Sequence, residues 1–255
     1  MLRQLDTKGW AIVSGVFSNA LMRDIESALE AALSRREKIR RENHVDGQND
    51  GTLHHLLVDH PAFLEVLEVL ASFDPLIRAF LSGNYILNSY GGVINRRATK
   101  AYVHNVHRDI RFASDAKRFM LNCLVMLDDF TLENGATFLL SSSQSRDSRP
   151  DDKQFFDQSE RAVGPKGSVL FFDSRLWHAT GPNLTDYPRK ALTLTFTSPF
   201  FKQQLDYPRL FGYENGDSLS LFLRQVVGFN ARVPATLEEF YLPVEKRYYQ
   251  RGQDE

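Results

Sequence analysis

This chain lacks the features that mark secreted, membrane-spanning or nucleic-acid-binding proteins. Cys123 is its one cysteine, so no disulfide can form within the chain, and the reducing cytoplasm suits it. No apolar run reaches the length of about 18 residues that a membrane-spanning helix needs. The formal net charge is −1, which gives no electrostatic reason to bind nucleic acid or a membrane surface. We therefore expect a cytoplasmic protein whose partner is a small molecule.

What the chain does have is the composition of an ordinary globular protein. Hydrophobic residues make up 42% of its 255 residues and charged residues 25%, enough apolar material for a sizeable core. A chain of this length can form one large or two small domains. No Pro-rich linker, internal repeat or low-complexity tract divides it. The sequence therefore predicts a single domain over residues 1–255, acting as a monomer or a homodimer.

Residues 1–83 and 202–255 show helical patterns. A first helix follows Ser18 or Asn19, either of which can cap it, and ends in a basic run over residues 35–41 that we interpret as a solvated helix end. The apolar residues of this helix recur at helical spacing: Leu21, Ile25, Leu29 and Leu33. A second helix begins at Pro61, breaks near residue 74 and ends at Ser82. In the tail, helical character returns at residues 217–227, 237–241 and 244–249.

Between residues 84 and 201 the pattern changes to short β-rich segments separated by turn residues. The predicted strands cover residues 85–90, 101–107, 119–127, 136–140, 168–172 and 190–200. So many short strands in this length favour a sandwich or jelly roll, with the helices covering one sheet. The predicted fold class is α+β: a double-stranded β-helix core, jelly-roll and cupin-like, flanked by N-terminal and C-terminal helices.

The last predicted strand has one polar and one apolar face. Arg189, Thr193 and Thr195 alternate with apolar residues such as Leu192 and Leu194. A strand that is apolar outside and polar inside indicates helices on the outer surface and a polar cavity within. The alternative is an ordinary half-exposed strand with Arg189 in a surface salt bridge.

Two histidines and a carboxylate indicate a metal site. In His107-Arg108-Asp109 the first and third side chains share one face of a strand, and His178 follows about 70 residues later. Two imidazoles and one carboxylate are the ligands of non-haem Fe(II) oxygenases, which leave the opposite coordination positions open. His44-Val45-Asp46 shows the same spacing but lies in a polar, glycine-rich stretch, so we interpret it as a solvated loop. Taken alone, His107 and Asp109 are equally consistent with a hydrogen-bonded structural pair.

Four segments, in order, resemble the phytanoyl-CoA dioxygenase family of Fe(II)- and 2-oxoglutarate-dependent oxygenases. They are residues 6–17 followed by a long helix, the His107-Arg-Asp109 motif, residues 133–144, and residues 167–183 followed by Arg189. Arg189 follows His178 by 11 residues (189 − 178), the family spacing. The family's Pro-Gly-Ser-His element is Ser-Ser-Ser-Gln here, at residues 141–144, a departure that we expect to change only a turn.

The resemblance implies a role for each matching residue. His107, Asp109 and His178 would ligate Fe(II), and Arg189 would pair with the distal carboxylate of 2-oxoglutarate. Four further residues are candidates for co-substrate binding: Asn122, Thr180, His104 and Thr193, the last interpreted as the replacement of a serine. The activity implied is a hydroxylase that uses O₂ and releases succinate and CO₂. The carboxylate of Asp109 favours hydroxylation over halogenation, because related halogenases have Gly or Ala there.

The sequence gives the least information about the substrate. Several polar or cationic residues near the motifs suggest a small anionic or multiply hydroxylated compound, although surface solvation explains most of them: Asn95, Arg96, Arg97, Lys100, Arg111 and Arg175. Desaturation, epoxidation and ring closure stay open, and residues 44–60 are a candidate lid. Two other classes remain as alternatives: a cupin-like metal-dependent isomerase or epimerase, and a non-catalytic ligand-binding barrel.

Overall fold

The computed structural model describes residues 1–45, 51–97, 101–112, 116–146, 148–249 and 251. Its largest element is an antiparallel sheet of six strands in the order β1-β7-β4-β9-β3-β2. Their bounds are β1 Trp10–Val13, β2 Thr52–His54, β3 Ile86–Asn95, β4 Met120–Met126, β7 Val169–Asp173 and β9 Arg189–Thr197. A second sheet has the order β6-β5-β8, with β5 at Phe138–Leu139, β6 at Glu160–Arg161 and β8 at His178–Ala179.

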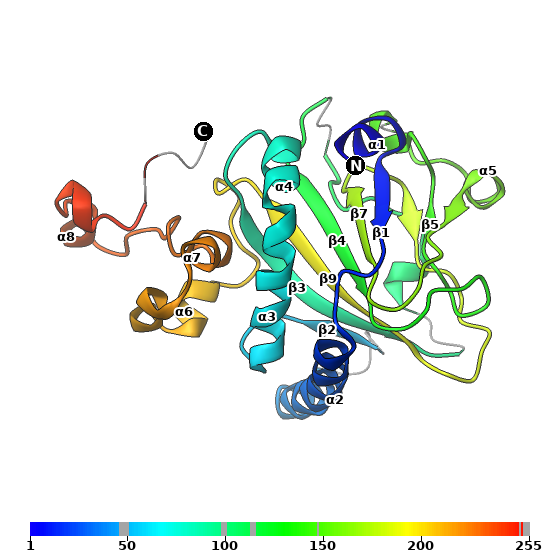
Figure 1. Ribbon diagram of the computed structural model, residues 1–255, viewed down its shortest axis with the longest axis horizontal. Coiled ribbons are helices and arrows are strands. Elements are labelled where there is room, and N and C mark those ends of the chain that lie inside the picture. Colours follow the sequence, from blue (N-terminus) through cyan, green and yellow to red (C-terminus); the bar gives the residue numbers. More distant parts are fainter. Residues whose placement is uncertain (46–50, 98–100, 113–115, 147, 250, 252–255) are drawn as a thin grey trace.

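Helices of the N-terminal region cover the large sheet, as the sequence predicted, but this region is not wholly helical: β1 and β2, which lie within residues 1–83, are the two edge strands of that sheet. The helices are α1 Leu2–Lys8, α2 Asn19–Glu42, α3 Pro61–Leu70 and α4 Asp74–Leu81, with a 3-10 turn, η1 Ala71–Phe73, between the last two. The Ser18 hydroxyl accepts a hydrogen bond from the Leu21 amide and caps α2, while Ser82 ends α4 in the left-handed region at φ 60°. Figure 1 shows α3 and α4 lying across the strands of this sheet. The predicted α+β class, with a double-stranded β-helix type of core between flanking helices, is confirmed; the described strands form two sheets and not a closed barrel.

The apolar face of β9 packs against these helices. Leu192, Leu194 and Phe196 are buried in one core with residues of α2, α3 and α4. Gly92, which pairs with Leu192 across the sheet, lets α2 approach: an added Cβ would lie 2.7 Å from Leu29 Cδ1. Burial of this face leaves the opposite face of the sheet, which carries Arg189, for the cavity described below.

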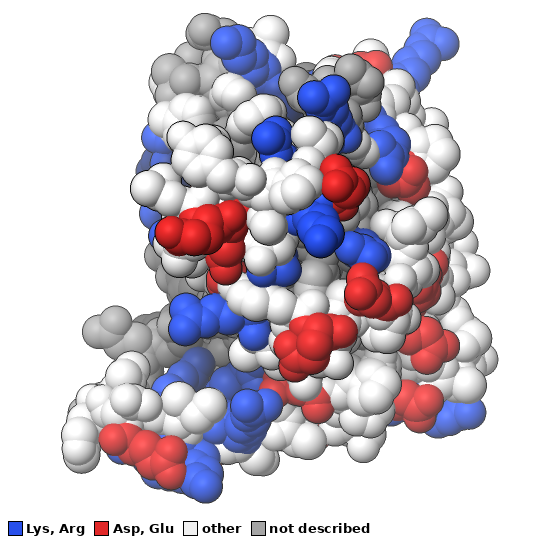
Figure 2. Space-filling model, turned by 90° about the vertical axis from the view of Figure 1, so that its left-hand side faces the viewer, with Lys and Arg blue, Asp and Glu red and all other residues white. Residues whose placement is uncertain are grey.

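The remaining helices are short. They are α5 Asp152–Gln158, α6 Tyr207–Phe211, α7 Leu221–Val227 and α8 Leu237–Phe240, with 3-10 turns η2 Tyr102–His104, η3 Ser143–Ser145, η4 Tyr213–Ser218 and η5 Val244–Lys246. The predicted helix over residues 217–227 is shorter than expected, because the Ser220 hydroxyl caps α7 at the Leu223 amide. Among the described residues, no helix combines the length and apolar character needed to cross a membrane. Figure 2 shows basic and acidic side chains interspersed on one face of the molecule.

The prediction of a strand over residues 101–107 is wrong. Tyr102–His104 is a 3-10 turn in which the His104 ring accepts a hydrogen bond from the Ala101 amide at 3.2 Å. Such a local bond between side chain and backbone competes with strand pairing. Residue His107 alone pairs, as an isolated bridge with His178.

The basic end of α2 is largely solvent-exposed, as predicted, but two of its arginines also make long-range contacts. Arg36 donates to the carbonyls of His54 and His55 at 2.8 and 2.7 Å, and Arg40 donates to the carbonyl of Thr52 at 3.0 Å. Arg36 also pairs with Asp59 at 2.6 Å. These arginines fix the backbone of β2 and of the residues after it, which a reading of helix periodicity alone does not reveal.

Candidate metal centre

A cavity of about 410 Å³ lies against the polar face of the large sheet. Strands β3, β4 and β9 contribute its floor, and the segment around residues 102–111 and strand β8 contribute another wall. Of the eight residues that the sequence singled out, the cavity brings together seven: His107, Asp109, Asn122, His178, Thr180, Arg189 and Thr193. His104 is not among its lining residues.

His107, Asp109 and His178 converge at one point of this cavity. Each offers a ligand atom, and these atoms all lie within 4.8 Å of one another. Asp109 Oδ1 is 3.6 Å from His107 Nε2, and Asp109 Oδ2 is 3.7 Å from His178 Nε2. Separations of this size leave room for one metal ion between the three side chains, since metal–ligand bonds are about 2 Å long. The geometry fits a 2-His-1-carboxylate site.

Hydrogen bonds on the far side of each imidazole select the nitrogen that faces the centre. His107 Nδ1 lies 2.8 Å from the Asn105 carbonyl, and His178 Nδ1 lies 2.9 Å from the Leu176 carbonyl. A carbonyl only accepts, so both Nδ1 atoms carry the proton and both Nε2 atoms keep a lone pair. Metal-binding histidines are typically oriented in this way.

Asp109 is held from two directions although it belongs to no strand. Its amide donates to the Ser174 carbonyl at 2.9 Å, and Asn122 Nδ2 donates to its Oδ2 at 2.7 Å. The bridge between His107 and His178 precedes it, with both backbone bonds at 2.9–3.0 Å. The bridge and the Ser174 contact replace the predicted strand in bringing His107 and Asp109 to the same cavity.

Electrostatics around His178 favour a neutral ring. Burial, then the nearby His107, lower the pKa of His178 to about 4, against the opposing effect of Asp109. Metal ions bind the neutral imidazole, so no proton has to leave His178 at neutral pH before a metal binds. The ring also packs edge-on against Phe172, with centroids 4.9 Å apart.

Arg189 is the largest fully buried side chain of the described structure and lines the same cavity. Its Nη2 donates to the Gly135 carbonyl at 3.1 Å, its guanidinium lies 4.3 Å from the Phe130 ring centroid, and its Nε has no hydrogen-bond partner among the described residues. Burial lowers the pKa of Arg189 to about 10, so it stays charged at neutral pH. The surface-salt-bridge alternative is wrong. A buried cation with an orphaned donor fits an anionic ligand such as the carboxylate of 2-oxoglutarate.

The other expected co-substrate residues occupy different positions. Thr193 lies on β9, on the same face of the strand as Ala191 and Arg189. Thr180 directly follows β8, and its amide donates to the Val103 carbonyl at 2.8 Å. His104 has one ring nitrogen bonded to Ala101 and the other buried without a partner among the described residues. Sequence reasoning missed Thr137, beside β5, and placed residues 52–55 only within the candidate lid, whereas they form a wall of the cavity. No motif marks these residues, since sheet pairing alone brings them to the cavity.

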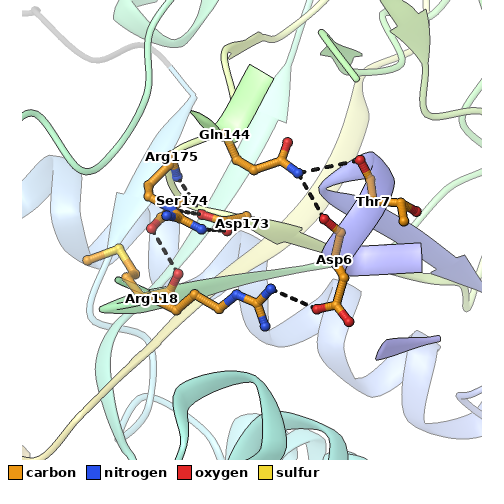
Figure 3. A network of polar contacts seen from close by, with 8 residues as sticks. Asp6, Thr7, Arg118, Gln144, Asp173, Ser174 and Arg175 are labelled. Carbon is orange, nitrogen blue, oxygen red and sulfur yellow. Dashed lines mark hydrogen bonds and ion pairs between the residues drawn. The ribbon is translucent and has the colours of Figure 1, made fainter. Parts of the chain in front are cut away.

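Residues 141–144 do more than form a turn. Figure 3 shows Gln144 donating to the carbonyls of Asp6 and Thr7 in α1, while Arg118 pairs with Asp6 at 2.7 Å. The Ser143 hydroxyl accepts a hydrogen bond from the Trp177 amide at 3.0 Å, next to His178. The segment that departs from the family pattern therefore fastens α1 to the strand that carries a triad residue.

The remaining polar candidates mostly lie outside the cavity. Asn95 donates to the Gly181 carbonyl, Arg97 pairs with Asp186 at the surface, and Arg175 is buried against Asp173. Arg96 is exposed and Lys100 lies outside the described residues. Arg111 alone of this group lines the cavity.

The second His-x-Asp match and the candidate lid are described only in part. His44 is exposed, as a solvated position requires, whereas Asp46 and the rest of residues 46–50 lie outside the described structure. Residues Thr52–His54, which belong to the same stretch, form the edge strand β2 of the large sheet.

Comparison with known proteins identifies the class. The model of the phytanoyl-CoA dioxygenase (PhyH) family matches residues 5–191. The protein Rv1501 of Mycobacterium tuberculosis is 31% identical over 195 residues, 75% of this chain and 70% of its own length. The iron/alpha-ketoglutarate-dependent dioxygenase penM of Penicillium thymicola is 28% identical, over 54% of this chain and 52% of its own length.

Solved structures agree on the fold. HygX from Streptomyces hygroscopicus, determined with nickel and 2-oxoglutarate bound, superposes with a TM-score of 0.61 at 19% identity, covering 79% of this chain and 87% of its own. AviO1 from Streptomyces viridochromogenes gives a TM-score of 0.56 at 20% identity, covering 78% and 94%. This chain belongs to the phytanoyl-CoA dioxygenase family. It is a 2-oxoglutarate-dependent non-haem iron dioxygenase, with O₂ as the other co-substrate.

Proposed function

We propose that this enzyme hydroxylates an unactivated C–H bond of a small polar metabolite or natural-product intermediate, releasing succinate and CO₂. His107, Asp109 and His178 ligate the Fe(II), and Arg189 binds the distal carboxylate of 2-oxoglutarate. One observation carries the assignment: three ligand atoms within 4.8 Å of one another share a cavity with a buried arginine whose Nε has no partner among the described residues. Structural pairing alone explains the triad but leaves the Nε of that arginine without a partner among the described residues.

Each residue of the chain has a positioning task in this proposal. Asn122 fixes the carboxylate of Asp109, and the carbonyls of Asn105 and Leu176 hold the two imidazoles in the tautomer that binds metal. Arg189 orients 2-oxoglutarate through a planar, permanently charged fork, with Thr193 and Thr180 as neighbouring polar contacts. When bound, the iron supplies the O₂-dependent chemistry that couples decarboxylation of 2-oxoglutarate to oxidation of the substrate.

The carboxylate at position 109 supports oxygenation over halogenation. Asn122 holds Asp109 between the two histidines, at the position that a halide would need. Supplied with Fe(II), 2-oxoglutarate, ¹⁸O₂ and chloride, the wild type should place labelled oxygen, and no chlorine, in its product. Asp109→Gly should lose most hydroxylation, because it removes the charged ligand. A chlorinated product from the wild type would refute the role given to Asp109.

We further propose that residues 1–255 act as one catalytic domain in the cytoplasm, as a monomer or a homodimer. The C-terminal part contributes directly near the cavity: the Tyr207 hydroxyl lies 3.1 Å from His55 Nδ1, and His55 lines the cavity. Removal of residues 202–255 should therefore disturb the site as well as the stability of the fold.

Conversion of 2-oxoglutarate to succinate tests the proposed function most simply. The purified protein with Fe(II), O₂ and no added substrate should form succinate slowly, and His178→Ala should form none. A wild-type protein that binds metal and yet forms no succinate would instead favour a metal-dependent isomerase or epimerase. A protein that binds neither metal nor 2-oxoglutarate would favour a ligand-binding role.

A further inference from the structure

With metal and 2-oxoglutarate bound, each charged side chain that lines the cavity would have a partner of opposite charge, except Arg111. Apart from the histidines, the charged lining residues are Asp109, Arg111 and Arg189. In the proposed mechanism the metal neutralises Asp109, and the carboxylate of 2-oxoglutarate neutralises Arg189. Arg111 makes no hydrogen bond or ion pair with another described residue, so its charge has no counterpart in the loaded site. Arg111 is solvent-exposed at the edge of the cavity, where its guanidinium is accessible to an anionic group of the substrate.

A second hollow beside the cavity is lined by Arg111 and by two further arginines, Arg108 and Arg149. It measures about 280 Å³ and shares His107 and Arg111 with the main cavity. Its two other arginines are engaged. Arg108 donates to the Arg146 carbonyl at 3.2 Å, and Arg149 pairs with Asp152. Arg111 therefore stands at the junction of the two hollows with its binding capacity free for a ligand.

A further wall of the cavity offers an uncharged contact. Thr52 on β2 is 5% exposed, lines the cavity, and its Oγ1 has no hydrogen-bond partner among the described residues. A buried hydroxyl without a hydrogen-bond partner is unfavourable, so a ligand that reaches it gains from the pairing. The backbone around Thr52 is fixed by Arg40, which gives this wall a defined position.

The electrostatic field on this wall also favours an anion. Burial lowers the pKa of His54, and the charges of Arg40 and Arg36 lower it further. Burial also lowers the pKa of His55. Both histidines therefore stay neutral near pH 7 and act as hydrogen-bonding groups at the cavity wall. The positive field that disfavours an imidazolium here stabilises a negative charge brought in by a substrate.

We propose that the substrate of this enzyme carries a carboxylate or phosphate group that binds Arg111, and a hydroxyl or other uncharged polar group that hydrogen-bonds Thr52. This inference rests on the proposed function, because it assigns Asp109 and Arg189 to the metal and to 2-oxoglutarate. It makes Arg111 and Thr52 the residues that determine substrate specificity, on parts of the chain separated by more than 50 residues.

Small anions test the Arg111 part directly. Trp177 lines the second hollow with Arg111, so in a Trp10→Phe background its fluorescence reports on binding there. The protein loaded anaerobically with Fe(II) and 2-oxoglutarate is titrated at constant ionic strength with inorganic phosphate and, separately, with acetate. We expect a saturable change, and the tighter of the two anions identifies the substrate's charged group. Arg111→Gln should raise the Kd by about tenfold or more, the scale of a charge-assisted hydrogen bond.

Arg97→Gln is the matched control, because Arg97 is an exposed arginine paired with Asp186 and outside the cavity. It should bind the anion as the wild type does. No saturable change in the wild type, or equal binding by wild type and Arg111→Gln, would overturn the proposal. Succinate formation without substrate is measured on the same samples: its absence would count against the proposed function, whereas its presence without anion binding would count against Arg111 alone.

The Thr52 part has its own readout. Thr52→Val replaces the unpaired hydroxyl by a methyl group of similar shape, so the Tm should stay unchanged or rise. Glucose, gluconate and glucose 6-phosphate are compared as activators of succinate formation. We expect an anionic member to exceed glucose, and Thr52→Val to reduce that stimulation about fivefold or more, within the range of one hydrogen bond. A Tm lowered by Thr52→Val, or stimulation that is equal for all three compounds, would refute the assignment.

Discussion

Strand β9 pairs with β3 and β4 over nearly its whole length, whereas Asp109 belongs to no strand and His178 lies in a strand of two residues. The large sheet is positioned by repeated backbone bonds and by an apolar core that it shares with the helices. The triad is positioned by the isolated bridge between His107 and His178 and by individual contacts with Ser174, Asn122, Asn105 and Leu176. The scaffold can therefore be weakened without changing the geometry of the site, and the site can be destroyed without unfolding the scaffold.

Substitution of a triad histidine should separate the two regions most clearly. We expect His178→Ala to abolish turnover and to weaken Fe(II) binding by more than the 10–100-fold that loss of an outer partner costs. The Tm of the metal-free protein should change little, because His178 contributes a side chain to the site but only backbone bonds to the small sheet. Metal titration and thermal unfolding check both parts. His44→Ala changes an exposed histidine and is the control. If metal binding depended on His44 and not on His178, the assignment of the metal ligands would be wrong.

A core substitution should do the reverse. Leu192 is fully buried between the sheet and the helices. Leu192→Ala should lower the free energy of unfolding by about 2–5 kcal/mol through lost contacts and a residual cavity. Fe(II) affinity, measured well below the unfolding transition, should stay close to that of the wild type. A loss of metal affinity in the folded variant would show that sheet and site are coupled.

Arg189 connects the two regions, since it lies on β9 and serves the cavity. Arg189→Lys keeps the charge but loses the planar fork, so 2-oxoglutarate binding should weaken by about 1–3 kcal/mol. Isothermal calorimetry on the anaerobic metal-loaded protein measures this. Arg97→Lys makes the same exchange at an exposed arginine outside the cavity and should have no effect. Unchanged affinity in Arg189→Lys would mean that another group binds the co-substrate.

The smallest effect should come from the residue that supports Asp109. Asn122→Ala removes the 2.7 Å hydrogen bond to Oδ2 but leaves all three ligands. We expect about tenfold weaker Fe(II) binding, the low end of the range for outer partners, with turnover retained at saturating metal. Loss of turnover even at saturating metal would assign Asn122 a direct role in binding 2-oxoglutarate.

Much of the scaffold was predictable because local chemistry dictates it. The Ser18 cap, the Pro61 start and the Ser82 stop each act through one residue and its own backbone. The prediction of a strand over residues 101–107 was wrong. The His104 ring accepts a hydrogen bond from the Ala101 amide and stabilises a 3-10 turn, which strand propensities do not predict. Residues 35–41 are mostly solvent-exposed, as predicted, but the contacts of Arg36 and Arg40 could not be predicted, because their partners are backbone carbonyls distant in sequence.

The sequence by itself determined the α+β class, the identity of the triad candidates and the polar face of β9 that carries Arg189. These follow from periodicity, residue chemistry and fixed spacing, all of which can be read directly from the sequence. The tertiary structure alone decided that Thr52 and Arg111 share the cavity with the triad, and that His104 does not. It also decided that Gln144 fastens α1 to the rest of the fold. These placements depend on strand order and on single long-range hydrogen bonds, which leave no periodic signal in the sequence.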